Sequence, residues 1–271
     1  MPISSANGVE AYYETAGQGP PLLLIHALPF DHHLWMYQVA RFATWFRTIA
    51  VDVRGWGRSG KPRGEFTLRD MCRDVLGVLR DEGVGQTLVM GCSIGSKMAL
   101  TLAIDDPAIF TGVVLVGGHS GPQNQFDHRI AGYREAARDG TLADYHLAHL
   151  RHGVSKRFAE SALGDHLLRS FVERGRSLDA ESIAQVFRAL TLSDLTPELP
   201  RFRTPILIVN GEHDNALAGG TRTAGLIQGS EHRILPDTGH CCFLEDPRGF
   251  EIVVLDFLAR HGLMPPSYAG S

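Results

Sequence analysis

Features that define several other classes of protein are scarce or missing from this sequence. Cysteine is rare, and the 4 cysteines stand at irregular positions: Cys72, Cys92, Cys241 and Cys242. This pattern excludes a disulfide framework and favours free thiols in a reducing compartment, so we expect a cytoplasmic protein. No apolar run approaches the ~20 residues that span a bilayer, and the first residues lack the basic segment and apolar core of a secretory signal. We therefore expect no membrane partner.

Charge of one sign is not in excess either. Charged residues make up 21% of the chain, and the formal net charge is −4. The basic residues form no stripe and do not alternate with aromatic residues, so we expect no nucleic-acid partner. No internal repeat and no low-complexity segment is visible, and nothing in the sequence indicates an oligomeric state.

Metal-ligand spacing is also missing. Cys241 and Cys242 follow His240 directly, but adjacent cysteines rarely converge on one zinc ion. The other groups of histidines lack carboxylate or cysteine partners at ligand spacing, and we interpret them as surface or packing residues: His32, His33, His146, His149 and His152. The sequence thus predicts neither a metal ion nor an organic cofactor.

Short apolar runs rich in valine, isoleucine and leucine recur along the chain, each bounded by glycine or proline. They are PLLLIHA (21–27), TIAVDV (48–53), TLVMGC (87–92), GVVLVGG (112–118) and PILIVNG (205–211). Apolar residues without alternation are typical of strands covered on both faces, hence of a parallel sheet between helices. The segment 66–83 has apolar residues at helical spacing and ends on Gly83, a suitable C-cap. The sequence predicts a doubly wound, mostly parallel α/β fold.

The alternation of strands and helices stops after residue 118. Only helical patterns follow, and they include 126–140, 142–153 and 179–190. We expect a helical cap at 119–195 that covers the carboxyl ends of the strands, where sheets of this kind bind ligands. The alternative is a helical region that packs against one edge of the sheet. Residues 1–118 and 196–264 then form the core, and 265–271 a flexible tail.

The stretch VMGCSIGSK joins a predicted strand to a predicted helix, and Gly91 and Gly95 flank Ser93 in it. A serine on such a turn takes a strained backbone conformation that lifts its hydroxyl above the sheet, and glycine relieves crowding two positions away. The helix points its N-terminus at the site, so the N–H of Ile94 is free to stabilise an oxyanion. The motif alone is weak, and the alternative is a glycine-rich connector with an inert serine.

A serine hydroxyl needs a base within hydrogen-bond reach and a third group that orients the base. Asp214 follows the strand 205–211, and His240 follows a glycine in the loop after the run HRILP. The order Ser93, Asp214, His240 is the one expected for this architecture. The strand 112–118 ends without a carboxylate, which favours Asp214 as the acid. Competing residues of the same loops, which we interpret as loop residues, are Glu212, His213 and Asp237.

A second oxyanion donor is expected from the loop HALPFDHHLW, which follows the strand 21–27. If this loop follows the architecture, the N–H of Leu28 faces the site together with that of Ile94. His26 would then brace the loop, and Trp35 would pack in the core. Pro29 is a candidate for a cis peptide bond.

The segments HALPFDHHLW, DVRGWGRS, GCSIG, GEHD and TGHCCFLEDP resemble the α/β-hydrolase fold family in order and rough spacing. The resemblance extends from NGVEAYYE to DFLARHG and implies that family's fold and a serine nucleophile. Ala27 stands where the family usually has glycine, and a methyl group there would narrow the oxyanion loop. Ser93 differs from the aspartate of the epoxide hydrolase and haloalkane dehalogenase branches. The loop LPFDHHLW and the segments around 126–144 and 193–214 are loosely similar to 3-oxoadipate enol-lactonase-type hydrolases.

Together these residues predict a serine hydrolase that cleaves a small carboxylic ester or lactone through an acyl-enzyme. One alternative is a C–C bond hydrolase of a β-diketone-like or ring-cleavage product, which uses the same triad. Another is a non-catalytic ligand-binding or non-hydrolytic member of the fold, against which an intact triad argues. Candidates for the substrate lining, which helical spacing also fits to core packing, are Phe126, Tyr133, Tyr145, Phe187 and Leu190.

Overall fold

A mixed, mostly parallel sheet forms the centre of the molecule. The computed structural model describes residues 3–5, 7–122, 126–174 and 179–265. The sheet has 8 strands in the order β1-β2-β4-β3-β5-β6-β7-β8. Their bounds are Ile3–Ser4 (β1), Ala11–Ala16 (β2), Pro21–Ile25 (β3), Arg47–Val51 (β4), Thr87–Cys92 (β5), Phe110–Val116 (β6), Ile206–Gly211 (β7) and Glu231–Leu235 (β8). Strands β3 to β8 pair in parallel, whereas β2 is antiparallel to β1 and β4, so the predicted fold class is confirmed.

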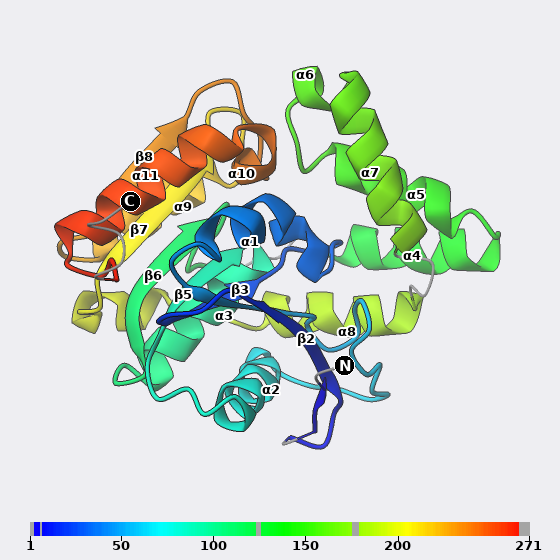
Figure 1. Cartoon of the computed structure of the whole chain (residues 1–271). Coiled ribbons are helices and arrows are strands. Elements are labelled where there is room, and N and C mark those ends of the chain that lie inside the picture. Colours follow the sequence, from blue (N-terminus) through cyan, green and yellow to red (C-terminus); the bar gives the residue numbers. More distant parts are fainter. Residues whose placement is uncertain (1–2, 6, 123–125, 175–178, 266–271) are drawn as a thin grey trace.

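Helices cover both faces of the sheet, which explains why its strands carry apolar residues without alternation. On one face, α2 (Leu68–Asp81) and α3 (Ile94–Asp105) pack on side chains such as Leu23 and Val89. On the other face, α1 (Met36–Phe42) and α11 (Pro247–Arg260) pack on the strand residues that alternate with these, such as Leu24 and Met90 (Figure 1). Alternate side chains of each of these strands therefore belong to two separate layers of the hydrophobic core.

Helix α2 begins and ends at the residues that the sequence signals favour. Thr67 accepts a hydrogen bond from the N–H of Asp70, and the Asp70 carboxylate accepts one from the N–H of Thr67, which completes a capping box. Gly83 has a φ of 64°, the left-handed conformation in which glycine ends helices. The prediction of a helix within 66–83 is confirmed, and it is shorter by the cap residues.

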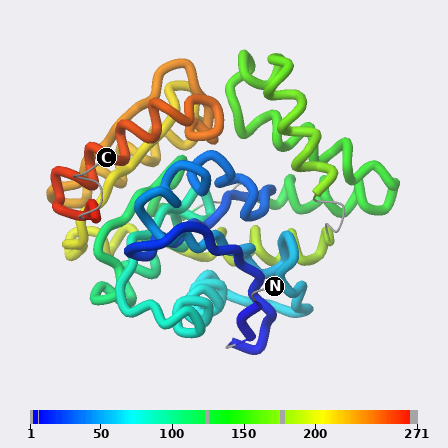
Figure 2. The backbone as a smooth tube through the Cα atoms, in the orientation of Figure 1, coloured from blue at the N-terminus to red at the C-terminus, as the bar shows by residue number. Residues whose placement is uncertain are grey.

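A series of helices is inserted between β6 and β7. They are α4 (Asp127–Arg138), α5 (Leu142–Arg151), α6 (Lys156–Ala159), α7 (Ala162–Arg174) and α8 (Ala180–Thr191). Helices α5, α6 and α7 stand to one side of the sheet in Figures 1 and 2, whereas α8 lies along the layer that contains α2. The predicted helices at 126–140, 142–153 and 179–190 correspond to α4, α5 and α8.

The inserted helices contact loops that follow the carboxyl ends of strands. A Cβ atom at Gly55, which follows β4, would lie 3.2 Å from Cβ of Ser182 in α8. The N–H of Cys241, which follows β8, donates to the carbonyl of Gly153 at 2.8 Å. The inserted helices therefore contact loops at the carboxyl end of the sheet, and their role as a cap over the strand ends stays a prediction. The domain boundaries at 118/119 and 195/196 stay predictions, and residues 266–271 of the expected tail lie outside the described residues.

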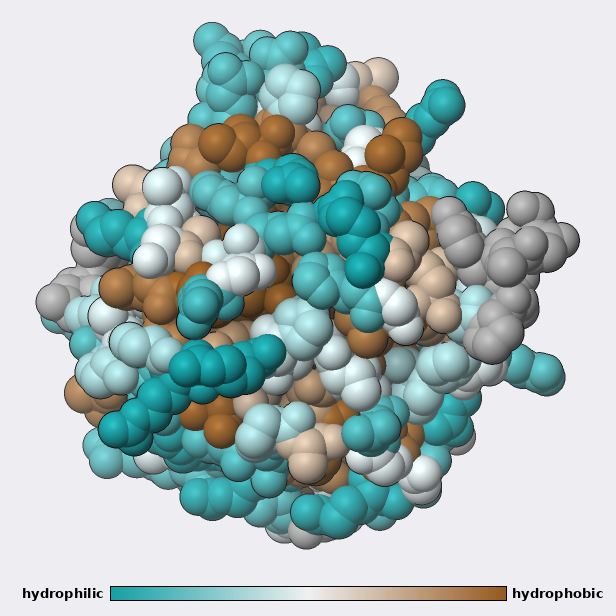
Figure 3. All heavy atoms as spheres, turned by 90° about the vertical axis from the view of Figure 1, so that its left-hand side faces the viewer, coloured by the Kyte–Doolittle hydropathy of each residue, from teal (hydrophilic) through white to brown (hydrophobic). Residues whose placement is uncertain are grey.

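The described residues also form two further helices and two 3-10 turns. They are α9 (Leu217–Leu226), α10 (Cys242–Glu245), η1 (His32–Trp35) and η3 (Thr196–Arg201). No helix in the described part of the chain combines the length and apolarity needed to cross a membrane. The face shown in Figure 3 is mostly hydrophilic with hydrophobic residues interspersed, which is the ordinary state of a protein surface.

Candidate active site

Ser93 occupies a strained turn between β5 and α3. Its φ of 55° and ψ of −109° lie in a region that residues with a side chain rarely adopt, and its N–H donates to the carbonyl of Val116 at 2.8 Å. A Cβ atom at Gly91 would lie 2.0 Å from the Gly95 oxygen, and one at Gly95 would lie 2.1 Å from the Ile25 oxygen. Both glycines are thus required by close backbone approach, and the predicted strand–turn–helix is confirmed.

Asp214 and His240 form a buried pair at the ends of β7 and β8. His240 Nδ1 donates to Asp214 Oδ1 at 2.7 Å. The carboxylate also accepts hydrogen bonds from Nδ2 of Asn210 at 2.7 Å and from the N–H of Ala216 at 2.8 Å. The side chain of Asp214 is fully buried, whereas 16% of the His240 side chain is exposed. A proton held on Nδ1 leaves Nε2 of the imidazole as the acceptor.

The electrostatics of this pair favour a charged carboxylate and a basic imidazole. Burial alone would raise the pKa of Asp214, but the charge of His240 and its hydrogen bond hold that pKa below its usual value. Burial alone would lower the pKa of His240, but Asp214 raises that pKa above its usual value. The imidazole is therefore a stronger base than a free histidine.

The imidazole of His240 lies against the end of β6, and the backbone of Ser93 is hydrogen-bonded to the same strand end. A Cβ atom at Gly117, whose φ is 59°, would lie 2.6 Å from Nδ1 of His240. Gly117 directly follows Val116, whose carbonyl accepts the N–H of Ser93. The structure thus gathers Ser93, Asp214 and His240 at the carboxyl rim of neighbouring strands.

The competing residues of the two loops lie away from this pair. Glu212 accepts a hydrogen bond from the N–H of Asp237 at 3.0 Å, and His213 faces Asp237 at 3.9 Å. All three of these residues are exposed. Asp237 has a φ of 54°, in keeping with its interpretation as a loop residue. They form a loop cluster of their own.

The loop after β3 is braced as predicted. His26 Nδ1 donates to the Ala27 carbonyl at 2.9 Å, and its Nε2 accepts the N–H of Val53 at 2.9 Å. Burial lowers the pKa of His26, which suits the neutral ring that these two bonds require. The Leu28–Pro29 peptide bond is cis.

The two predicted oxyanion donors start from suitable backbone positions. Ile94 is the first residue of α3, so its N–H has no acceptor within the helix. Leu28 follows the fully buried Ala27 in the loop after β3. Trp35 stacks on Phe243 with ring centroids 4.4 Å apart, which confirms its packing role. That both N–H groups face the reacting oxygen stays a prediction.

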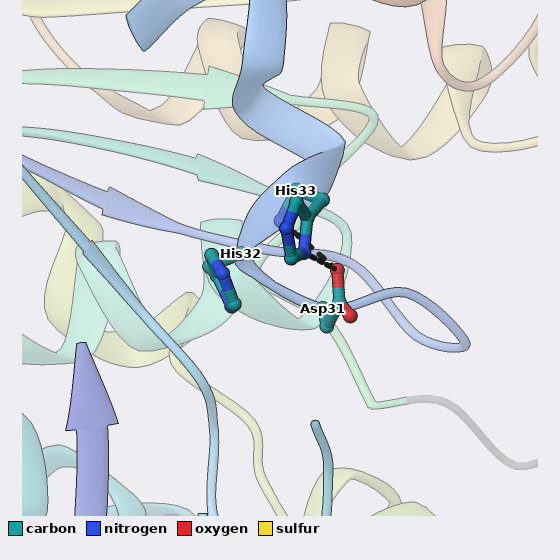
Figure 4. A group of neighbouring side chains, drawn as sticks. All are labelled: Asp31, His32 and His33. Atoms are coloured by element: carbon teal, nitrogen blue, oxygen red, sulfur yellow. Dashed lines mark hydrogen bonds and ion pairs between the residues drawn. The ribbon is translucent and has the colours of Figure 1, made fainter. Parts of the chain in front are cut away.

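Sequence spacing assigned no carboxylate partner to His32 or His33, but the structure gives each of them one. His32 Nδ1 pairs with Asp52 Oδ1 at 2.7 Å. His33 Nδ1 pairs with Asp31 Oδ1 at 3.1 Å, as Figure 4 shows. Asp52 is distant in sequence and reaches His32 because β4 lies beside β3. Asp31 caps the turn that begins at His32.

Three of these residues, Asp31, His32 and His33, are close enough to raise the question of a metal ion. The two imidazole rings lie with centroids 4.0 Å apart and are tilted by 37° relative to each other. Each Nδ1 atom also has a carboxylate already. The cluster fixes the loop between β3 and α1.

The aromatic residues predicted to line the substrate site gather in the inserted helices. The rings of Phe126 and Phe187 lie 4.7 Å apart, and those of Tyr133 and Tyr145 lie 4.9 Å apart. Tyr133, Phe187 and Leu190 are buried in the core, whereas Phe126 and Tyr145 are partly buried against it. The structure brings the residues together, and their contact with substrate stays a prediction.

Sequence reasoning missed the residues that tie the inserted helices to the rim. Glu245 accepts hydrogen bonds from the N–H of Gly239 at 2.8 Å and from the N–H of Ser155 at 3.0 Å. It thereby joins the His240 loop to the segment between α5 and α6. No local signal distinguishes this glutamate from a surface residue.

Lys97 was missed as well. It is 1% exposed, and its Nζ donates to the carbonyls of Gly121 at 2.7 Å and Ser193 at 2.6 Å. These carbonyls lie on the segments that enter and leave the inserted helices. Burial lowers the pKa of Lys97 to about 8. A signal was present, because Lys97 interrupts an otherwise small and apolar helix.

A mostly parallel sheet with a strained serine between β5 and α3 is the architecture of an α/β hydrolase. Residues 20–247 match the family described as alpha/beta hydrolase fold, and the chain belongs to this family. The resemblance seen in the sequence is thus confirmed, and the chain is an α/β hydrolase.

The relatives include proteins named as lactonases and as an esterase. The chain is 26% identical to 3-oxoadipate enol-lactonase 2 of Acinetobacter baylyi over 94% of this chain and 96% of the relative. It is 26% identical to a pimeloyl-[acyl-carrier protein] methyl ester esterase of Yersinia pseudotuberculosis over 92% of this chain and 97% of the relative. The enol-lactonase from Burkholderia xenovorans LB400 superimposes with a TM-score of 0.87 at 27% identity, covering 95% of this chain and 100% of that one.

Proposed function

We propose that the protein is a serine hydrolase that cleaves a small carboxylic ester or lactone through an acyl-enzyme. The observation that carries the proposal is the strained Ser93 at the same rim as the Asp214–His240 pair. Relatives named as lactonases and as an esterase support the ester or lactone bond as the target.

In the proposed mechanism, Ser93 Oγ attacks the substrate carbonyl while Nε2 of His240 takes its proton. The N–H groups of Ile94 and Leu28 hold the negative oxygen of the tetrahedral intermediate. The imidazolium then gives its proton to the leaving oxygen, and the acyl group stays on Ser93. A water molecule, deprotonated by His240, hydrolyses that ester and frees the acid. Asp214 holds the imidazole in the required tautomer and stabilises its charged form throughout.

Labelling with a fluorophosphonate tests whether Ser93 is an activated nucleophile. We expect the reagent to add one phosphonyl group to the wild-type protein, and peptide mapping to place that group on Ser93. The variant Ser93→Ala should stay unlabelled. The matched control Ser5→Ala removes an exposed serine outside the helices and strands and should label like wild type. Absence of labelling in the wild type would contradict the proposal and favour a binding protein.

A panel of substrates then identifies the bond. Turnover of p-nitrophenyl esters and of lactones, with loss in Ser93→Ala, supports the proposal. Turnover of β-diketones alone would favour a C–C bond hydrolase, since the triad is the same.

The location is also a proposal. Cys72, Cys92, Cys241 and Cys242 are buried free thiols, which supports a reducing, cytoplasmic compartment.

A further inference from the structure

One partly buried cation of the inserted helices has no counterion among the residues that the structure describes. Arg129 lies in the first turn of α4 and is partly buried. Among the described residues, it takes part in no ion pair and no hydrogen bond. Arg134, one turn further on, shows the ordinary state, because it binds Glu181 at 2.6 Å. A cation near a helix N-terminus is also opposed by the helix dipole. The guanidinium of Arg129 is therefore available to an anionic ligand.

Arg129 lies on the face of α4 that meets α5. It precedes Tyr133 by four residues, so the two side chains lie on the same side of the helix. The Tyr133 ring lies 5.6 Å from the His149 ring, and its hydroxyl lies 3.4 Å from Nδ1 of His146. The guanidinium of Arg129 packs over the Phe126 ring, 5.6 Å from its centroid. Arg129 thus belongs to the aromatic cluster.

Helix α5 connects this cluster to the catalytic loop. The chain runs from His149 into Gly153, whose carbonyl accepts the N–H of Cys241 at 2.8 Å. On the other side of His240, a Cβ atom at Gly239 would lie 2.6 Å from the nitrogen of Ser155. The segment after α5 therefore touches both neighbours of His240.

The charge of Arg129 reaches the imidazole of His240. Burial and the charge of Arg129 both lower the pKa of His240, although Asp214 outweighs them, so the guanidinium lies within electrostatic reach of the site. Burial and, after it, the charge of Arg129 lower the pKa of His149 to about 3, so His149 is neutral and does not compete for an anion.

Two buried or partly buried carboxylates whose charges reach the cluster already have partners. Asp214 accepts the Nδ1 proton of His240 at 2.7 Å, and Asp31 pairs with His33 at 3.1 Å. Glu135 lies on α4 but is exposed to solvent. A partly buried guanidinium beside aromatic rings, with no carboxylate of its own, is suited to a ligand that brings one.

We propose that Arg129 binds a free carboxylate of the substrate, so that the site selects esters or lactones carrying a second acid group. This inference rests on the proposed function. The planar guanidinium donates two parallel hydrogen bonds to a carboxylate, and the Phe126 ring holds its face. The carboxylate would thereby fix the scissile carbonyl relative to Ser93.

Matched ethyl esters test the proposal. Monoethyl succinate, glutarate and adipate share their acyl lengths with ethyl butanoate, pentanoate and hexanoate, and all six release ethanol. We expect kcat/KM of the wild type to favour an acidic ester by about tenfold to a hundredfold, the range of a hydrogen-bonded charge pair. In Arg129→Gln this preference should vanish, and in Arg129→Lys part of it should return.

The control is Arg138→Gln, which removes the same charge from the exposed last turn of the same helix. It should keep the preference of the wild type. Equal rates for acidic and neutral esters in the wild type, or a preference that survives in Arg129→Gln, would overturn the inference. Hydrolysis of the neutral esters by Arg129→Gln shows that the triad is intact in the variant.

A binding measurement separates this inference from the proposed function. Glutarate should raise the melting temperature of the wild type and of Arg138→Gln, and should leave that of Arg129→Gln unchanged. If no ester is hydrolysed but this pattern holds, the proposed function fails and the anion site stands. If esters are hydrolysed but glutarate stabilises all three proteins equally or none, the anion site fails and the proposed function stands.

Discussion

The rim of the sheet and the inserted helices position their residues by different means. At the rim, backbone contacts leave no freedom, since a Cβ atom at Gly91 or Gly95 would lie within about 2 Å of a carbonyl oxygen. In the inserted helices, aromatic rings pack 4.7 to 4.9 Å apart, and a few polar bonds from Lys97 and Glu245 attach the helices to the core. In the proposed function, backbone geometry would fix the reaction, whereas the choice of substrate would depend on side chains that can be exchanged.

The largest effect is expected from Ser93→Ala at the rim. Loss of the nucleophile should lower kcat by about 10⁴-fold or more, because only binding and oxyanion stabilisation remain. The urea midpoint should change little, since the backbone N–H bond to Val116 is kept. Steady-state kinetics on a p-nitrophenyl ester measures the loss. Retention of a tenth of the activity would show that Ser93 is not the nucleophile.

Asp214→Asn should lower kcat by about 10⁴-fold, because the amide no longer favours the tautomer with the proton on Nδ1. The wild-type activity should fall as the pH drops, with a midpoint above 6.5, since Asp214 raises the pKa of His240 and the protonated ring cannot act as base. The variant's midpoint should move to lower pH. In the control Asp237→Asn, an exposed carboxylate of the same rim, both rate and midpoint should match the wild type. If the pH midpoint of Asp214→Asn matches that of the wild type, Asp214 does not raise the pKa of His240.

Gly95→Ala should destabilise the fold by about 1–3 kcal/mol or more, because the new Cβ atom meets a backbone oxygen that cannot move aside. Chemical denaturation measures the loss. The control is Gly225→Ala in α9, where nothing lies within 4 Å of the new atom. That variant should gain about 0.5–1 kcal/mol, since alanine favours a helix. An equal change in the free energy of unfolding of the two variants would contradict the claim that backbone contacts at the rim are tighter than elsewhere in the fold.

Lys97→Met should cost about 1–3 kcal/mol, because the carbonyls of Gly121 and Ser193 lose their donor. The loss should be local, so limited proteolysis should cut the inserted helices before the sheet. Lys156→Met removes an exposed lysine of the insertion and should leave the cleavage pattern unchanged. Uniform cleavage of Lys97→Met along the chain would show that Lys97 does not attach the insertion.

The contrast between the rim of the sheet and the inserted helices also decides what the sequence could predict. Strands β3 to β7 follow from their apolar runs, and the turn at Ser93 follows from the glycines that it requires. Strand β2 was not expected, because it lies near the edge of the sheet and ends in the exposed Glu14 and Thr15. A strand with polar positions has no apolar run to identify it.

Contacts between distant segments were beyond the sequence. The pairing of His32 with Asp52 depends on β3 lying beside β4, and the separation of the two residues in the sequence does not indicate it. The isolation of Arg129 is likewise visible only when its neighbours in space are known. Asp214 and His240 were predictable as residues after strands, because parallel strands bring their carboxyl ends to one rim. Side-chain packing in the insertion follows no such rule.

A crystal structure of the protein after reaction with a fluorophosphonate tests the central claim most directly. The account predicts phosphorus on Ser93 Oγ, a phosphoryl oxygen that accepts from the N–H groups of Ile94 and Leu28, and Nε2 of His240 within about 2.6–3.2 Å of an adduct oxygen. An adduct on another residue, or an imidazole turned away from Ser93 while still bound to Asp214, would contradict it.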